Sequence, residues 1–156
     1  MSYRRYEESA DDATRRLIGD YRHAASFRPA IVRALEKWDG KVYNKRFLDA
    51  LRTEAGYNRI YADRRESIVH IYIYSAEGYT QFTVVSIPLQ DRRINAADAI
   101  KNAGERYTDR MKKAAEIEQT APEIPGYIQQ LKDLDRIRAQ IIGRIPYDLR
   151  DIYGIH

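Results

Sequence analysis

Tyrosine and arginine gather in the middle of this sequence, within a segment whose residue pattern is typical of β-strands. The chain has 13 tyrosines against one tryptophan and three phenylalanines. Alternate residues of a strand share a face, so one face of the expected sheet carries tyrosine, histidine and arginine, with further arginines at its margins. The candidate binding residues are Arg59, Tyr61, Arg64, Arg65, His70, Tyr72 and Tyr74.

These residue types suit three interpretations. Tyrosines stack on unpaired bases while arginines hold phosphates, as in proteins that bind single-stranded nucleic acid. Tyrosine and arginine are equally enriched where proteins bind one another. In the third interpretation helices cover this face too, and the expected positions of Ile68, Val85 and Ile87 on it favour such burial.

No grouping of residues predicts a reaction. His70 lies on an expected strand without a second histidine near it, so we interpret it as a partly buried residue held by a hydrogen bond. Adjacent carboxylates such as Asp11 and Asp12 point in different directions on a helix, and we interpret them as solvated or matched to the helix dipole. The chain has no cysteine and no glycine-rich phosphate-binding motif. We therefore predict no catalytic residue, no metal ligand and no cofactor.

The charge balance of the chain is mildly basic. Lysine and arginine number 27 against 23 aspartates and glutamates, and most of the excess lies in residues 1–56. Such a balance permits weak attraction to nucleic acid or to an acidic partner. The first arginines are followed by acidic residues rather than an apolar run, so we expect no leader peptide. No apolar stretch approaches the roughly 18 residues of a membrane helix, and we expect a cytoplasmic protein without a membrane partner.

Three helices are expected before the tyrosine-rich segment. Apolar residues at spacings of three and four predict a helix over 7–25, with acidic residues early in it and basic residues late. Pro29 suits the first turn of a second helix, whose apolar face ends at Trp38, and we expect the Trp38 side chain to be buried. Asn44 is the expected cap of a third helix, and Gly56 is its expected end.

The periodicity then changes from helical to alternating. Residues rich in isoleucine, valine, tyrosine, threonine and phenylalanine predict strands over 58–63, 67–75 and 79–87. Tight turns at 64–66 and 76–78 would join these strands into a three-stranded antiparallel meander.

The register of the second hairpin follows from a two-residue loop at Glu77-Gly78. This loop places Ile71 opposite Val84 and Val69 opposite Ser86, which sorts apolar side chains to one face and tyrosines to the other. The side chains expected to be buried on the apolar face are Val69, Ile71, Ile73, Phe82 and Val84.

Two long helices, about 95–119 and 125–143, are expected after the strands, with a break at Thr120-Ala121-Pro122. A short break predicts an antiparallel helical hairpin. Each helix carries an apolar seam, which either packs within the chain or pairs with a second copy as in a coiled coil. Residues 144–156 form a short helix or tail.

The expected fold class is therefore α+β, with N-terminal helices, a three-stranded antiparallel β-meander and a C-terminal antiparallel helical hairpin. We expect one domain over 1–156, in which 1–56 is helical, 57–90 is the meander and 95–143 is the helical hairpin.

A family resemblance covers about residues 40–75. A helix followed by Gly56-Tyr57-Asn58-Arg59-Ile60-Tyr61 and then by the strand at 67–75 resembles the helix-then-meander order of small RelE-type ribosome-dependent ribonuclease toxins. The resemblance implies a nuclease, and no catalytic residue is carried over from it.

Three classes of function remain open. The first is a small non-enzymatic accessory or adaptor protein that acts through a protein–protein interface, by binding a partner or by self-association. The second is a nucleic-acid-binding module that uses the face with tyrosine and arginine. The third is a small nuclease. The first leads, because no nucleophile, base and orienting group can be assembled from the sequence.

Overall fold

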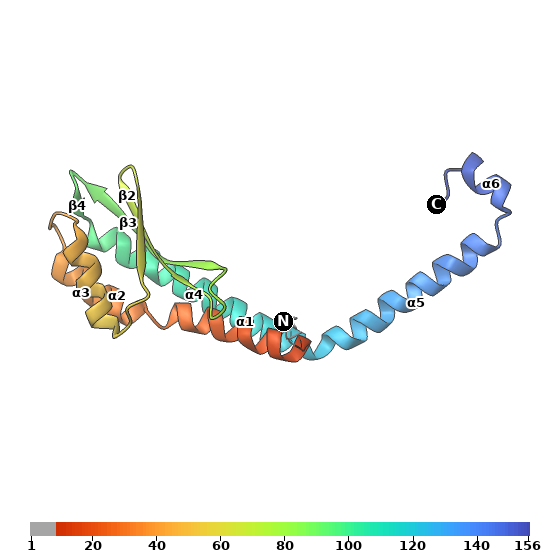
Figure 1. Ribbon diagram of the computed structural model, residues 1–156, viewed down its shortest axis with the longest axis horizontal. Helices are drawn as coiled ribbons and strands as arrows, with labels where there is room; N and C mark the ends of the chain where they lie inside the picture. Colours follow the sequence, from red (N-terminus) through yellow and green to blue (C-terminus); the bar gives the residue numbers. More distant parts are fainter. Residues whose placement is uncertain (1–8) are drawn as a thin grey trace, which may run out of the picture. The chain divides into compact units, whose positions relative to one another are not determined.

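Residues 10–55 form three helices, as their pattern predicts. The computed structural model describes residues 9–156, with helices α1 (Ala10–Ala25), α2 (Arg28–Trp38) and α3 (Lys45–Ala55) in this part (Figure 1). The expected start of the first helix at residues 7 and 8 lies outside the described residues. The Ser9 side chain caps α1 by accepting a hydrogen bond from the Asp12 amide, 3.2 Å away.

The cap residues of α3 act as the sequence predicts. The Asn44 side-chain oxygen accepts a hydrogen bond from the Arg46 amide at 2.8 Å. Gly56 ends the helix with a φ of 61°, a left-handed conformation that glycine adopts without strain. Both ends of α3 are therefore fixed by local sequence.

An antiparallel sheet follows, which confirms the α+β class but adds a strand to the expected meander. Its strands are β1 (Tyr61–Arg65), β2 (Ile68–Tyr74), β3 (Gln81–Gln90) and β4 (Arg93–Ile94), in the order β1-β2-β3-β4. The two-residue strand β4 was not expected because it follows a turn at Asp91 and Arg92 that contains no glycine, although both residues have positive φ.

Of the two predicted turns, the one at 76–78 is confirmed and the one at 64–66 is displaced. The turn between β2 and β3 lies at 76–78, with Gly78 at a φ of 83°, as expected. The turn between β1 and β2 lies later than 64–66, because β1 extends to Arg65 and the chain reverses at Glu66, which has a φ of 55°. The first strand also begins at Tyr61 rather than at residue 58.

A β-bulge divides the register between β2 and β3. Near the turn the predicted pairs are present, with Ile73 opposite Phe82 and Tyr72 opposite Thr83. Beyond the irregularity at Ile71 and Tyr72 the prediction is wrong by one residue, and Ile71 lies opposite Val85. A bulge sets two residues of one strand against one of the other.

The bulge decides which side chains of β3 enter the core. Val84 and Val85 are both buried, and Ile87 is fully buried. Ser86 instead shares the opposite face with His70, its partner on β2. The expected placement of Val85 and Ile87 on the tyrosine-bearing face is therefore wrong, whereas the five side chains predicted to be buried are all buried.

One hydrophobic core joins a single face of the sheet to four helices. It contains Ile31 and Leu35 of α2, Phe47 of α3 and Ile71 of β2, together with small residues of α1 and α4. Trp38 is half-buried rather than buried, because it lies at the margin, where its ring meets the edge of Phe47 at 5.8 Å and Lys41 covers it.

Helix α4 (Ala96–Thr120) matches the first of the two long helices expected after the strands. Asn95 and Asp98 cap its N-terminus reciprocally: the Asp98 amide donates to the Asn95 side-chain oxygen, and the Asn95 side-chain amide donates to the Asp98 carboxylate. The buried residues of α4 are alanines, which let its backbone come close to the sheet.

The chain forms two compact units, which meet in sequence at Glu118 and Gln119. The second unit contains a 3-10 turn (Ala121–Glu123), helix α5 (Ile124–Gly143) and helix α6 (Tyr147–Ile152). All but the last two residues of α4 belong to the first unit and α5 belongs to the second, so their pairing as an antiparallel hairpin stays a prediction. Among residues 9–156, no helix combines the length and the apolar character that a bilayer crossing requires.

Candidate functional site

Three tyrosines form a cluster on the sheet face opposite the core. Tyr61 of β1 lies across from Tyr72 of β2, and Tyr74 follows two residues later on the same face. The ring centroids are 5.8 Å apart for Tyr61 and Tyr72, 5.6 Å for Tyr61 and Tyr74, and 5.7 Å for Tyr72 and Tyr74. Aromatic pairs at such distances attract each other, so the three rings form one ordered patch, here called the tyrosine cluster.

The face that carries the tyrosine cluster is open. Tyr61 is 37% exposed, and Tyr72 and Tyr74 are half-buried. No residue that β1, β2 or β3 places on this face is buried, among the residues that the structure describes. The structure of the described residues therefore contradicts the interpretation in which helices bury this face.

The predicted arginines do not share one surface. Arg65 is on the tyrosine-bearing face, where its guanidinium pairs with the Asp63 carboxylate at 3.0 Å. Arg64 is on the other face by strand alternation, and its positive charge acts there on the Tyr43 hydroxyl. Arg59, which precedes β1, is exposed and forms no ion pair with any described residue.

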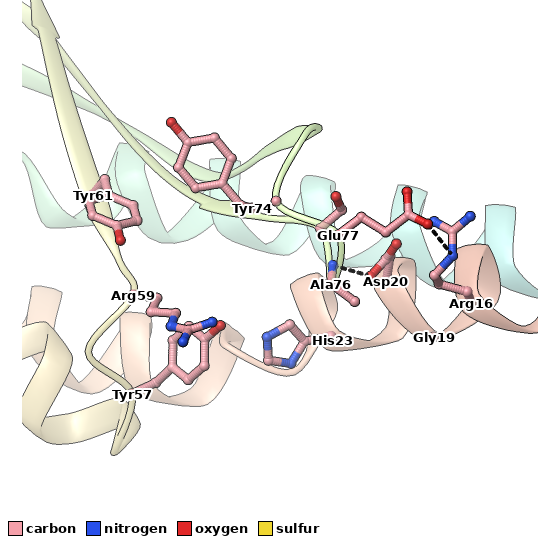
Figure 2. Close-up of a pocket in the computed structure, with 12 residues that line it drawn as sticks. Arg16, Gly19, Asp20, His23, Tyr57, Arg59, Tyr61, Tyr74, Ala76 and Glu77 are labelled. Carbon is pink, nitrogen blue, oxygen red and sulfur yellow. Dashed lines mark hydrogen bonds and ion pairs between the residues drawn. The ribbon is translucent and has the colours of Figure 1, made fainter. Parts of the chain in front are cut away.

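A cleft of about 690 Å³ adjoins the tyrosine cluster (Figure 2). Helix α1 forms one wall, the segment leading into β1 forms another, and the β2–β3 hairpin forms the third. The lining residues are Arg16, Gly19, Asp20, His23, Tyr57, Arg59, Tyr61, Tyr74, Ser75, Ala76, Glu77 and Gly78.

Two contacts hold the hairpin wall against α1. The Ala76 amide donates a hydrogen bond to the Asp20 carboxylate at 2.9 Å, and Asp20 is only 7% exposed. The Arg16 guanidinium pairs with the Glu77 carboxylate at 3.3 Å (Figure 2). The width of the cleft is therefore fixed by side chains of α1 rather than by the hairpin turn alone.

Aromatic contacts surround the His23 side of the cleft. The His23 ring lies 5.2 Å from Tyr57 and 5.0 Å from Phe27, in edge-on contacts. His23 and Tyr57 were not among the predicted site residues. The sequence does contain a signal for the wall that α1 forms, because polar residues and a glycine recur at spacings that place them on one side of a helix. These residues are Arg16, Gly19, Asp20 and His23.

His70 belongs to a hydrogen-bond network that ties α4 to the sheet. Its Nδ1 is 2.8 Å from Ser86 Oγ, which also accepts a hydrogen bond from Arg106 at 3.0 Å. Asn102 Oδ1 accepts from the Ser86 amide at 2.7 Å and from Arg106 Nε at 3.0 Å. This matches the interpretation of His70 as a partly buried, hydrogen-bonded strand residue.

The same network contains the residue types of a hydrolytic triad, since Asp63 lies opposite His70 in the register. Its geometry is that of a structural tie. Asp63 gives its carboxylate to Arg65, and the Ser86 hydroxyl is held between His70 and Arg106. None of these side chains lines the cleft.

The tyrosine cluster is also expected to affect stability at alkaline pH. Partial burial raises the pKa of Tyr72 above the ordinary tyrosine value, and the Tyr74 hydroxyl adds to this effect. The folded state then favours the neutral phenol, so the contribution to stability is complete below the pKa of unfolded tyrosine and is lost as pH rises through the folded pKa. We expect Tyr72→Phe to flatten this alkaline loss, measured by denaturant unfolding at several pH values. Tyr79→Phe is the control, because Tyr79 is 87% exposed, and equal curves for both variants would contradict the prediction.

The tyrosine cluster and the cleft form one continuous surface, because Tyr61 and Tyr74 belong to both. We call this combined region the tyrosine surface. It joins three aromatic rings in tilted and edge-to-face contact, the exposed guanidinium of Arg59 and a concave wall. No protein-family model, curated protein or solved structure matches this chain.

Proposed function

We propose that this chain is a non-enzymatic accessory or adaptor protein that binds a protein partner on the tyrosine surface. The observation that carries the proposal is the open cluster of Tyr61, Tyr72 and Tyr74 beside a cleft of about 690 Å³. Tyrosines contribute large contact areas at low entropic cost and dominate many protein interfaces. Here the rings are already held by one another, so little further order is lost on binding.

The charges around the tyrosine surface favour a protein over a nucleic acid. Arg65 and Arg16 are neutralised by Asp63 and Glu77, and those carboxylates lie on the same surface. A phosphate backbone would meet acidic groups as often as basic ones. Arg59 is exposed and would pair with one acidic or carbonyl group of a partner peptide.

Gly19 is a position in the wall of the cleft where a small side chain can be added without touching the tyrosines. It lies within α1 and lines the cleft, and a Cβ there would have no atom within 4 Å. We expect Gly19→Ala to stabilise the protein by about 0.5–1 kcal/mol through helix propensity. Thermal unfolding measures this gain, and a loss of stability would show that the site is more crowded than the structure indicates.

Binding is tested with peptides selected on the wild-type protein from a random peptide library, with affinities measured by fluorescence polarisation. We expect Tyr72→Ala to weaken binding by roughly 30-fold, the effect of a central interface residue. Gly19→Phe should weaken it as well by filling the cleft, whereas Gly19→Ala should leave it unchanged. Selected peptides that bind wild type and Tyr72→Ala equally would overturn the proposal.

A second candidate function rests on Arg59, the cation without a described partner next to Tyr61. If the tyrosine surface binds single-stranded nucleic acid, Tyr72→Ala should cost about 1–3 kcal/mol at every sequence. Arg59→Ala should reduce the salt slope by a little under one unit. Labelled oligonucleotides titrated at several salt concentrations measure both effects. No binding at low salt would remove this alternative.

A further inference from the structure

Helix α5 of the second unit presents a regular apolar stripe to solvent. The stripe repeats at alternating spacings of three and four residues and includes one charged position, Arg138. Ile128 and Ile137, which are 46% and 51% exposed, flank the stripe on either side. The helix has no buried residue. The apolar members within the helix are Ile124 (43% exposed), Tyr127 (47%), Leu131 (61%), Leu134 (60%) and Ile141 (52%).

This stripe requires a partner. The 20 residues of α5 span about 30 Å, and helices of this length depend on packing of an apolar face for most of their stability. The repeat of 3.5 residues is the pattern of a coiled coil, in which two helices bury such stripes against each other. A continuous exposed stripe of this kind marks an interface.

We propose that α5 pairs in antiparallel orientation with α5 of a second copy of this chain. The heptad positions then form layers along the whole helix. Ile124 packs against Ile141 of the second copy, and Leu131 packs against Leu134. The remaining layer places Arg138 against Tyr127 of the second copy, and each layer occurs twice by symmetry.

The charge of Arg138 selects this orientation. In a parallel pair at the same register, the two Arg138 side chains would face each other across the seam, and like charges there repel. In the antiparallel pair the guanidinium meets the Tyr127 ring, whose hydroxyl donates a hydrogen bond to the Glu123 carboxylate at 3.0 Å. The Arg138 guanidinium, which also donates a hydrogen bond to the His156 carbonyl of its own chain, thus gains both an aromatic face and a carboxylate.

Pairing through α5 goes beyond the proposed partner binding, because it uses residues of the other unit. A dimer carries two tyrosine surfaces, so it would hold a partner with two binding segments far more tightly than either surface alone. Partner binding and pairing through α5 can be refuted independently. The peptide-binding variants change residues of the first unit, and the association variants change residues of the second.

The first test is the molar mass in solution. Light scattering after size exclusion should give twice the chain mass of 18.3 kDa at high concentration. Leu131→Asp combined with Leu134→Asp should give the single mass, while Gln140→Asp, on the outer side of α5, should remain dimeric. The fluorescence of Trp38 checks that the first unit stays folded in each variant. A wild type that is monomeric at every concentration would overturn the proposal.

The second test fixes the orientation, and the absence of native cysteine makes it direct. Positions 124 and 141 are about 25 Å apart along the helix, too far for a disulfide in a parallel pair. A mixture of Ile124→Cys and Ile141→Cys chains, one carrying a mass tag, should give the mixed disulfide on oxidation. Cross-links only between like chains would overturn the antiparallel arrangement.

The third test addresses the charge. Arg138→Glu should shift the equilibrium toward monomer by placing a second carboxylate beside Glu123 of the other copy. Adding Glu123→Arg to the same chain should restore the dimer, because the pair of opposite charges is regenerated in reverse. Failure of the double variant to recover association would refute the contact between Arg138 and Glu123.

Discussion

Replacing Ile71 with alanine is expected to lower the free energy of unfolding by about 2–5 kcal/mol. The Ile71 side chain is fully buried at the centre of β2, between Ala62 of β1 and Val85 of β3. Removing it deletes apolar contacts and leaves a cavity that close-packed neighbours fill only in part. Denaturant unfolding followed by circular dichroism measures the change, with an unaltered slope showing that the unfolded state is the same.

Ile68→Ala is the matched control on the same strand. Ile68 is 40% exposed and lies on the open face, so its truncation should cost less than about 1 kcal/mol. Equal costs for Ile68 and Ile71 would contradict the assignment of the two faces. A larger cost for Ile68 would place the strand one residue out of register.

Arg106→Ala is expected to lower the free energy of unfolding by about 1.5–3 kcal/mol, the range for hydrogen bonds to charged groups. The half-buried guanidinium joins Ser86 of β3 to Asn102 of α4, and its loss leaves both partners with one bond fewer. We expect faster amide hydrogen exchange at Ser86, whose amide depends on Asn102 for its acceptor.

Lys112→Ala serves as the comparison for Arg106→Ala. Lys112 is an exposed cation on the same helix, so its loss changes charge and helix propensity in the same direction without breaking a tie to the sheet. We expect a change within about 0.5 kcal/mol. If the two variants were equally stable, the network between α4 and β3 would contribute nothing to the fold.

Local signals predicted the elements of the fold well. Asn44 and Gly56 marked the ends of α3 because capping depends on neighbouring residues alone. Gly78 likewise marked the turn between β2 and β3. The turn at Asp91 and Arg92 was missed because residues other than glycine adopt positive φ there, held by the Tyr43 amide bound to the Arg92 carbonyl.

The bulge in β3 required information from the rest of the chain. A regular hairpin register sends Ser86 into the core, whereas the structure buries Val84 and Val85 together and turns Ser86 to the open face. The free energy of burying valine and isoleucine outweighs one interrupted ladder position. Two consecutive valines followed by a serine are the sequence signal of this shift.

The candidate site likewise contains one part that the local sequence predicted and one part that it could not predict. Tyr61, Tyr72 and Tyr74 were placed on one face by alternation within neighbouring strands, which is a local property. The cleft depends on contacts between residues far apart in sequence, such as Asp20 with Ala76. The prediction included Arg64 in the site because Arg64 lies near the end of the strand, but it did not consider which face of the sheet the Arg64 side chain occupies.

The contacts of α4 along β3 also affect whether the edge of the sheet can pair with a strand of another chain. Asn102 accepts from the Ser86 amide, and Arg110 donates to the Thr83 carbonyl at 2.9 Å, so two polar backbone groups on the part of β3 that β4 does not cover are already satisfied. The opposite edge is β1, where three of five residues are charged. Short, charged edges resist the strand-to-strand growth that leads to amyloid. We therefore expect the edges of the sheet not to act as templates for aggregation, even though one face of the sheet exposes tyrosines.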